Sequence, residues 1–388
     1  MVVIVSMKKT KYEKLTRNKI GIAGLAGSVI LIFLTACTPG CVLQGVNERS
    51  DKSDIIIMSW NVENLFDGID DGTEYRKFDP GEGEWDTSRY HTRLSAVGRV
   101  ITELIDPMPD IICLQEVEHV GVVGDLLKWN LKQYGFNYSA VTDTDSSAIQ
   151  TGIISRYPIT RIRVHGSGIT GIIGYSLRPV LEVEILIGGE PVIVLNNHWK
   201  SRIGGANITE PARIASANII RRIVSRNSVE NPGMLIICAG DLNENANEYE
   251  RAGELYLTAL MPQTASVAAP LSLRVTGLTE KVSDELGVLY DPWLDSGEMF
   301  VSEGSYFYRN EWSTLDHLMV SAAAFDGVGL EFVSFTPFVH PWLLNASGEP
   351  VSWDVRSGEG YSDHLPVLMI LTTGAANTQV NRDQLPTL

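Results

Sequence analysis

Short apolar runs recur along the chain from Ile55 to Leu371, separated by polar, turn-rich segments. Runs of this length that are rich in Val, Ile and Leu predict β-strands. We place them at Ile55–Trp60, Ile111–Leu114, Gly152–Ser155, Leu181–Ile187, Val192–Leu195, Leu235–Ala239, Leu318–Val320 and Leu365–Leu371. Two longer segments, Thr92–Ile105 and Pro211–Ser225, predict helices; in the first, apolar residues follow a helical spacing.

The strand runs are apolar on both faces, so their sheets must be covered on both sides by helices or by another sheet. The pattern therefore predicts an α/β protein with at least two layers of strands. The segment from Asn245 to Phe300 fits less well, because a helix-like opening is followed by Pro270, Gly277 and Asp284 among small residues. We interpret this segment as a long connection with one or two helices.

The N-terminus has the pattern of a targeting signal. A basic stretch from Lys8 to Lys19 precedes the uncharged, mostly apolar Ile20–Ala36, which is short for a membrane span and typical of a signal peptide. Leu34-Thr35-Ala36-Cys37 resembles a bacterial lipobox, which implies acylation of Cys37 and a lipoprotein anchored to the membrane of the cell envelope, outside the cytoplasm. A plain secretory signal and an uncleaved anchor are the alternatives, and Met7 is an alternative start.

The chain divides accordingly into a signal peptide at residues 1–36, a tether at 37–53, one folded domain at 54–372 and a flexible tail at 373–388. The 388 residues carry a net charge of −16, and loss of residues 1–36, with six basic residues and one acidic residue, would make it −21. So acidic a body excludes a tight non-specific nucleic-acid binder. Cys113 and Cys238 lie in apolar runs and predict buried free thiols, without a disulfide scaffold or a zinc site.

Chemically active side chains stand at the ends of the predicted strands. Strand ends carry Asn61, Glu116, His198 and Asp241, and strand starts carry Asp316, Asp363 and His364. Binding sites gather at the carboxyl ends of strands in α/β sheets, and antiparallel neighbours bring their starts to the same edge. We therefore expect these residues to share one rim.

The order of these residues resembles the endonuclease/exonuclease/phosphatase superfamily. The matching segments are Ser59-Trp60-Asn61-Val62-Glu63-Asn64, Leu114-Gln115-Glu116-Val117-Glu118, Asn197-His198-Trp199-Lys200-Ser201, Gly240-Asp241-Leu242-Asn243-Glu244, Thr314-Leu315-Asp316-His317 and Ser362-Asp363-His364-Leu365-Pro366. The resemblance is greatest to bacterial secreted members described as predicted nucleases. It implies a four-layered α/β/β/α sandwich of two mixed β-sheets flanked by helices.

The resemblance also implies a metal-dependent reaction on a phosphate ester. It assigns Asn61 and Glu116 to the metal, and Asp363 is a further candidate ligand. One neutral oxygen and one carboxylate suit Mg²⁺, which keeps several waters, and Mn²⁺ is a second candidate. The metal would neutralise the charge that develops on the phosphate oxygens.

The remaining residues of the rim supply acid–base candidates. Asp241 and Asn243 are placed to orient the attacking water, and the matching histidine of the family, His364, pairs with Asp316. Whether Asp241 or His364 accepts the proton of the water stays open. His198 matches a histidine that contacts the phosphate or protonates the leaving oxygen. His317 should face away from Asp316, because successive strand residues point to opposite faces.

Basic residues near the motifs are candidates for phosphate binding: Lys200 and Arg202 follow His198, and Arg178 resembles an arginine of secreted deoxyribonucleases. The leading hypothesis is a lipid-anchored, Mg²⁺-dependent phosphodiesterase acting on DNA or RNA, monomeric and without an obligate protein partner. A phospholipid or sphingomyelin phosphodiesterase is the first alternative. A non-catalytic surface lipoprotein on the same fold is the second.

Overall fold

The computed structural model describes residues 3–5, 54–144, 147–166, 170–172, 175–283 and 285–373. The predicted signal peptide, the tether with Cys37 and the tail fall almost wholly outside these residues, apart from the short strand β1. In the part of the chain that is described, no helix is both long and apolar enough to cross a membrane.

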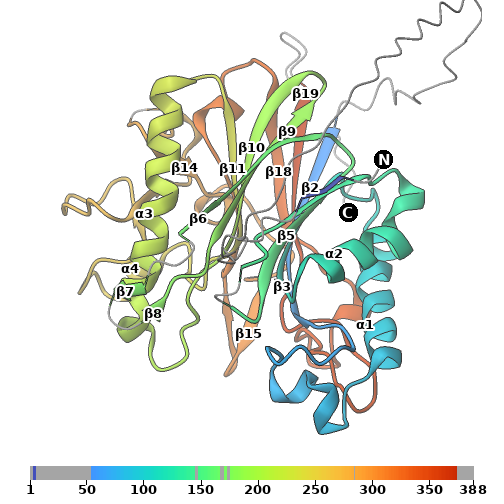
Figure 1. Cartoon of the computed structure of the whole chain (residues 1–388). Coiled ribbons are helices and arrows are strands. Elements are labelled where there is room, and N and C mark those ends of the chain that lie inside the picture. The colour runs from blue at the N-terminus through green and yellow to red at the C-terminus, as the bar shows by residue number, and fades with distance from the viewer. Residues whose placement is uncertain are drawn as a thin grey trace, which may run out of the picture. The chain divides into compact units, whose positions relative to one another are not determined.

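Two mixed sheets form the centre of the domain (Figure 1). The first has the order β1-β4-β5-β3-β2-β19-β18, and its strands are β1 (Val3–Val5), β4 (Tyr138–Val141), β5 (Gln150–Ser155), β3 (Ile111–Val117), β2 (Asp54–Leu65), β19 (Val367–Thr373) and β18 (Leu330–Pro337). The second has the order β12-β13-β14-β17-β11-β10-β9-β6, and its strands are β12 (Leu260–Pro262), β13 (Leu273–Thr276), β14 (Val288–Tyr290), β17 (Asp316–Val320), β11 (Leu235–Asp241), β10 (Glu190–His198), β9 (Val180–Ile187) and β6 (Ile159–His165).

Helices cover the outer face of each sheet. They are α1 (Thr87–Arg99), α2 (Val120–Leu126), α3 (Ala206–Glu230) and the single turn α4 (Glu248–Arg251). Short 3-10 or π-helical turns and two small hairpins complete the described elements: η1 (Arg76–Phe78), η2 (Pro80–Glu82), η3 (Val100–Leu104), η4 (Leu127–Leu131), η5 (Lys132–Tyr134), η6 (Thr279–Lys281), η7 (Pro292–Leu294), η8 (Ala322–Ala324), η9 (Pro341–Leu343), β7 (Thr170–Ile172) with β8 (Tyr175–Ser176), and β15 (Tyr306–Tyr308) with β16 (Glu311–Ser313). Figure 1 shows α1 and α2 on one side of the strands and α3 on the other.

The alternation of side chains along β2 and β3 explains the layers. Ile57 and Cys113 point into the core between the two sheets, which also holds Val194 and Ile237 from the second sheet. Their chain neighbours Met58, Ile112 and Leu114 point outward and pack under α1 and α2, while a third core lies between the second sheet and α3. Each strand is apolar on both faces because each face is buried. The predicted four-layered α/β/β/α sandwich is therefore confirmed.

Seven of the eight predicted strands fall within observed strands, and the last, predicted at Leu365–Leu371, is shifted. β19 begins at Val367, because the Leu365 amide donates to the carbonyl oxygen of Ser305 and Pro366 has no amide hydrogen. Asp363 and His364 consequently precede the strand instead of opening it.

Both predicted helices are observed with earlier starts. The helix α1 begins at Thr87, where the side chain of Asp86 accepts a hydrogen bond from the Arg89 amide, and η3 continues it to Leu104. The helix α3 begins at Ala206. The interpretation of 245–300 as a connection with one or two helices was wrong in part, because β12, β13 and β14 extend the second sheet there and α4 is a single turn.

Candidate active site

Strand register brings the first three site residues into one row. In the parallel pair β10–β11, His198 lies opposite Asp241, and in the antiparallel pair β11–β17, Asp241 lies opposite Asp316. All three side chains are almost fully buried. The row exists because β10 and β11 end where β17 begins.

The first sheet contributes the second half of the site. Asn61 lies opposite Gln115 in the parallel pair β2–β3, and Glu116 follows in the left-handed backbone region, with φ of 63°. The register shifts at Glu116 against β5, so this residue forms a bulge that turns its side chain out of the regular alternation. Asn243 also has a positive φ, of 50°. Such strained positions gather at functional sites.

Direct contacts join the two halves. Asn61 Nδ2 donates a hydrogen bond to Asp241 Oδ2 at 3.0 Å. His198 Nε2 lies 3.5 Å from the same oxygen and 3.6 Å from Glu116 Oε1. The amide of Asn64 donates to Glu116 Oε2 at 3.0 Å, and the amide of Asn243 donates to Asp241 Oδ1 at 2.8 Å. Both carboxylates are thus held in fixed orientations.

Asp316 and His364 form a buried pair. His364 Nδ1 lies 2.7 Å from Asp316 Oδ2, and the other ring nitrogen, Nε2, lies 3.9 Å from Asp241 Oδ2. Ser305 donates its hydroxyl to the same Asp316 oxygen at 2.6 Å. Asp316 therefore fixes the ring of His364 with Nδ1 as donor and leaves Nε2 directed at the row of site residues.

The two histidines of the site differ in charge. Burial alone would lower the pKa of His364, but the ion pair and hydrogen bond with Asp316, together with Asp363 and Asp241, raise its pKa well above the ordinary value. Burial, followed by the nearby charges of Arg178 and His364, lowers the pKa of His198 well below the ordinary value. At neutral pH, His364 is an imidazolium and His198 is neutral.

The two central carboxylates are held close to protonation when no cation is present. Burial is the main cause that raises the pKa of Glu116 to about 7, opposed by Arg178, and the main cause that raises the pKa of Asp241 to about 6, opposed by His364. A divalent cation would remove this penalty. The side chains of Glu116 and Asn61 offer the hard oxygen ligands that such an ion prefers, so the donor set fits a divalent metal.

Asp363 and Arg178 lie at the edge of this group. Asp363 is half-buried and its charge raises the pKa of Glu116, so it lies within electrostatic reach of the proposed metal ligands. Arg178 donates to the carbonyl oxygen of Trp199 at 2.7 Å, and its charge acts on Glu116 and His198. Arg178 is therefore the principal cation beside Glu116, whereas His364 has this role for Asp241.

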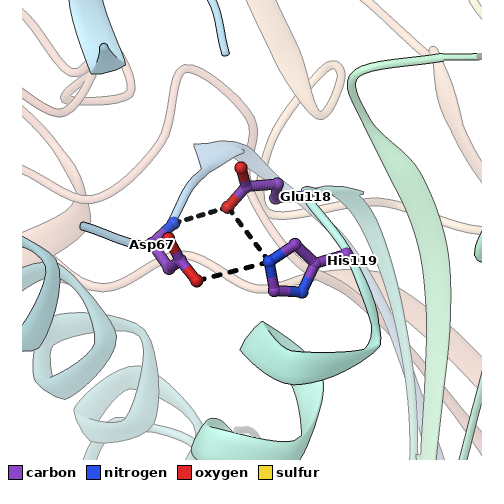
Figure 2. A group of neighbouring side chains, drawn as sticks. All are labelled: Asp67, Glu118 and His119. Carbon is purple, nitrogen blue, oxygen red and sulfur yellow. Dashed lines mark hydrogen bonds and ion pairs between the residues drawn. The ribbon is translucent and has the colours of Figure 1, made fainter. Parts of the chain in front are cut away.

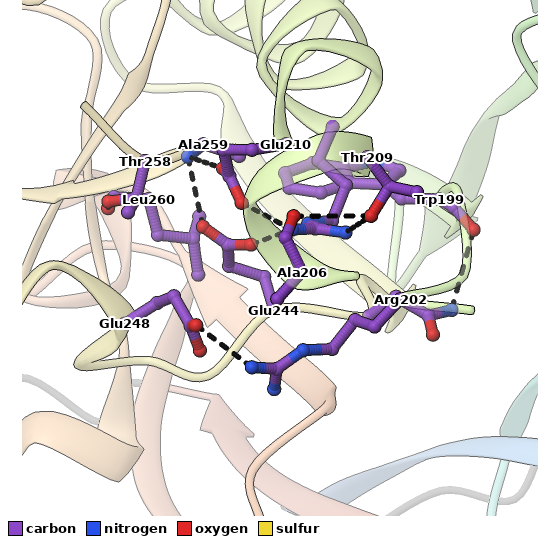
Figure 3. Close-up of polar contacts among 12 residues, drawn as sticks. Trp199, Arg202, Ala206, Thr209, Glu210, Glu244, Glu248, Thr258, Ala259 and Leu260 are labelled. Atoms are coloured by element: carbon purple, nitrogen blue, oxygen red, sulfur yellow. Dashed lines mark hydrogen bonds and ion pairs between the residues drawn. The ribbon is translucent and has the colours of Figure 1, made fainter. Parts of the chain in front are cut away.

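The other predicted site residues are Arg202, Lys200 and Asn243, and the contacts described for their side chains are to residues outside the central group. Arg202 is bound to Glu248 at 2.9 Å (Figure 3), so its charge is already neutralised. Lys200 lies close enough to Arg178 that this charge, after burial, lowers its pKa. The side chain of Asn243 lies 3.4 Å from the Trp199 carbonyl oxygen, to which Nδ2 donates.

Two features of the site have no counterpart in the sequence interpretation. Tyr306 from β15 packs its ring against that of His364, with centroids 4.6 Å apart. Below the rim, Gln115 Nε2 donates to Asn196 Oδ1 at 2.7 Å, and Asn196 Nδ2 donates to the carbonyl oxygens of Leu114 and Gly152. This buried amide pair ties the two sheets together beneath the site. The sequence signal that could have predicted this pair is the presence of the polar residues Gln115 and Asn196 inside otherwise apolar strands.

His317 faces away from the site, as predicted. Its Nδ1 lies 2.9 Å from Asp291 Oδ2 and its Nε2 lies 3.0 Å from the carbonyl oxygen of Glu244. His317 is thus a structural residue.

Comparison with known proteins places this geometry in a family. Residues 56–264 match the model of the endonuclease/exonuclease/phosphatase family. The chain is similar in structure to an endonuclease/exonuclease/phosphatase from Bacteroides vulgatus, with 14% identity, 83% of this chain and 100% of that chain covered, and a TM-score of 0.51. No curated protein matches the chain.

Two TDP2 structures are also similar to the chain. Truncated TDP2 from Caenorhabditis elegans has 19% identity, with 82% of this chain and 98% of that chain covered and a TM-score of 0.49. TDP2 from D. rerio, complexed with a single strand DNA product, has 15% identity, with 83% of this chain and 100% of that chain covered and a TM-score of 0.46. Because the family match spans more than half of the sequence, the chain belongs to the endonuclease/exonuclease/phosphatase family and is a metal-dependent hydrolase of the phosphodiesterase type.

Proposed function

We propose that this protein is a Mg²⁺-dependent nuclease, held at the outer side of a bacterial membrane by lipid on Cys37. The observation that supports the reaction is the continuous contact chain from Glu116 through His198 and Asp241 to the Asp316–His364 pair. A buried group of this composition can bind a metal cation and brings a proton acceptor, Asp241, and a hydrogen-bond donor, His364, within reach of one phosphate.

The metal would be bound by Glu116 and Asn61, and when bound it supplies positive charge against the phosphate oxygens. Asp241 accepts the proton of the attacking water, because the Asn61 amide and the Asn243 backbone orient its two oxygens and His364 lies beside it. The new P–O bond forms to this water, the P–O bond to the leaving oxygen breaks, and the leaving oxygen takes its proton from solvent water.

His364 is the donor in this scheme. As an imidazolium fixed by Asp316, it directs the Nε2 hydrogen into the site and stabilises the negative charge that develops on a phosphate oxygen. Neutral His198 lies between Glu116 and Asp241 and orients the phosphate. Arg178 and Lys200 supply positive charge for the remaining phosphate oxygens.

Nucleic acid is favoured as the substrate by two features of the rim. Tyr306 packs against His364 with its ring tilted, and Tyr75 is exposed near Arg178 and Glu116, so aromatic rings flank the cationic side of the site. Aromatic side chains beside a phosphate-binding group accept unstacked bases.

A phospholipid or sphingomyelin phosphodiesterase is the second candidate. The net charge of −16 opposes long polyanions, and Arg202, one of three candidate cations, is neutralised by Glu248. A zwitterionic headgroup needs fewer cations, and a lipid anchor at Cys37 would hold the site near such a substrate.

The two candidates are separated by assaying the purified full chain with Mg²⁺ against plasmid DNA, single-stranded DNA, RNA and sphingomyelin. Asp241→Asn is the matched control, because it keeps the shape of the side chain and removes the proton acceptor. Cleavage of nucleic acid by the wild type, lost in Asp241→Asn, supports the proposal. Turnover of sphingomyelin alone favours the second candidate.

The anchor is tested separately by incorporation of labelled palmitate. We expect Cys37→Ser to abolish incorporation and Cys41→Ser to leave it unchanged. Incorporation that persists in Cys37→Ser would contradict the anchor without affecting the proposed reaction.

A further inference from the structure

A second group of carboxylates lies outside the residues used above. The loop after β2 carries Asp67, Asp71 and Glu74, and β3 is followed by Glu118 and His119. One ligand atom from each of Asp71, Glu74 and Glu118 lies within 4.8 Å of the other two. Asp67, Glu118 and His119 form a second set with the same property (Figure 2). Glu118 belongs to both sets.

His119 is a hydrogen-bond donor here and not a metal ligand. The amide of Gly121 donates to its Nδ1 at 2.9 Å, so the ring hydrogen of the neutral form is on Nε2. Nε2 lies 3.3 Å from Asp67 Oδ2 and 3.8 Å from Glu118 Oε2. A nitrogen that carries hydrogen cannot bind a cation, which leaves only carboxylate oxygens and excludes a zinc-type donor set.

Glu118 is the feature that distinguishes this group from ordinary surface acids. Its side chain is 2% exposed, and Oε2 accepts a hydrogen bond from the Asp67 amide at 2.7 Å. Its other oxygen, Oε1, is buried and accepts no hydrogen bond from any described residue. Figure 2 shows Oε1 turned away from Asp67 and His119. A buried carboxylate oxygen without a donor is costly, and a cation would be the missing partner.

No lysine or arginine among the described residues forms an ion pair with Asp67, Asp71, Glu74 or Glu118. His119, when protonated, pairs with Asp67 and Glu118, and no described lysine or arginine offsets the charge of Asp71 and Glu74. Asp71 and Glu74 also lie close to one another: the amide of Asp71 donates to Glu74 Oε1 at 2.6 Å. Mutual repulsion of these carboxylates would loosen the loop unless a cation held them.

We propose that Asp71, Glu74 and Glu118 bind a Ca²⁺ ion, separate from the catalytic metal. Ca²⁺ takes six to eight oxygen ligands in flexible geometry, whereas Mg²⁺ demands near-octahedral geometry and is bound by one or two carboxylates with several waters. Three carboxylates, two of them on an exposed loop, suit the larger ion, with water and backbone oxygens completing the coordination.

Such an ion would act on the active site through Tyr75. This residue follows Glu74 directly, its ring lies 5.4 Å from that of Phe66, and its hydroxyl is within electrostatic reach of Arg178 and Glu116. Ca²⁺ would thus tie the loop to the end of β3 and fix an aromatic side chain beside the catalytic carboxylate. The site itself does not depend on the identity of the substrate.

The test uses the full chain in a Glu116→Gln background, which weakens the catalytic metal site and leaves the proposed one intact. Tb³⁺ serves as a luminescent probe of Ca²⁺ sites, excited through Trp85, whose Nε1 donates to the carbonyl oxygen of Asp67. We expect Tb³⁺ luminescence that Ca²⁺ displaces, and a Ca²⁺-dependent rise in Tm.

Both signals should be lost in the double variant Asp71→Asn, Glu74→Gln, whose exposed or half-buried positions preserve folding, and in Glu118→Gln. They should persist in Glu82→Gln, an acid of the same segment that pairs with Arg76. Equal Ca²⁺ stabilisation in the double variant, or no Ca²⁺-dependent signal in the Glu116→Gln parent, would overturn the proposal.

Discussion

Single partners set the charge of three buried histidines. His198 Nε2 lies 3.5 Å or more from the carboxylate oxygens of Asp241 and Glu116 and stays neutral, whereas His364 and His317 each lie within 3 Å of an aspartate oxygen. Burial opposes the charged form of all three, so the aspartates decide the outcome. The same side chain thereby serves as a neutral contact at one position and as a cation at the other two.

The Asp316–His364 pair should behave as one unit. We expect Asp316→Asn and His364→Gln to lower kcat by similar factors, and the double variant to lower it little further, because the second change removes a group that has already lost its function. Losses that multiply in the double variant would show two independent roles.

The pH dependence gives a second test of this pair. Asp316 raises the pKa of His364, and the protonated form is the donor, so activity falls as pH rises through that pKa. Asp316→Asn should move this alkaline limb of kcat to lower pH. An unmoved alkaline limb would mean that another group controls it.

His317 predicts a pH-dependent stability. Burial lowers the pKa of His317, but the charge and hydrogen bond of Asp291 outweigh burial and raise the folded-state pKa above the ordinary value. The stabilising contribution of His317 is therefore fully present below about pH 6.5 and is lost as pH rises through the folded-state pKa. We expect His317→Asn to cost roughly 3–5 kcal/mol near pH 6 and less at alkaline pH, measured by urea unfolding. His91→Asn, at an exposed position, is the control variant.

At the scale of elements, α3 holds the loop that follows β11. Arg213 on α3 is fully buried and pairs with Glu210 and with Glu244, at 2.7 Å for the latter. Both glutamates also accept a hydrogen bond from the Ala259 amide (Figure 3). Since Glu244 follows Asn243 directly, this network fixes the segment that carries Asp241 and Asn243.

Removing the cation of this network should be severe. Arg213→Met leaves two buried carboxylates without their partner and should destabilise the domain by roughly 3–5 kcal/mol. Arg202→Ala breaks the partly exposed pair with Glu248 and should cost about 1 kcal/mol or less. Urea unfolding of the two variants measures the difference, and equal costs would contradict the central role of Arg213.

The elements that could be predicted are those with a strong local signal. Buried strands such as Leu235–Ala239 can be predicted because they are continuous apolar runs. The end of this run predicts that Asp241 lies at the end of a strand. The strands β12 to β14 have only three or four residues among prolines and glycines, so no periodicity develops. Ser305 reaches Asp316 and Tyr306 reaches His364 at the hairpin β15–β16, and no local pattern reveals these tertiary contacts.

At the scale of the whole molecule, charge limits how a polyanion can bind. The chain carries −16, Arg178 and Lys200 are basic residues near the site, and Arg202 is paired with Glu248. Binding of DNA should therefore release few counterions, with a log–log slope of KM against salt of roughly 2 for two phosphate contacts.

Single variants show which of these basic residues contribute to DNA binding. We expect Lys200→Ala to raise KM for DNA and to flatten the salt dependence, while Arg202→Ala leaves both nearly unchanged. The reverse ranking would show that Arg202 exchanges Glu248 for the substrate.

The central claim is metal-dependent phosphodiester hydrolysis at the rim that contains Glu116. The most direct measurement is the rate of bis(p-nitrophenyl) phosphate hydrolysis by the full chain as a function of Mg²⁺ concentration, with wild type and Glu116→Gln compared. The account predicts no activity after EDTA, recovery with added Mg²⁺ in the wild type, and a much higher Mg²⁺ requirement or no recovery in the folded Glu116→Gln variant. Activity that resists EDTA, or the same Mg²⁺ response in both proteins, would contradict it.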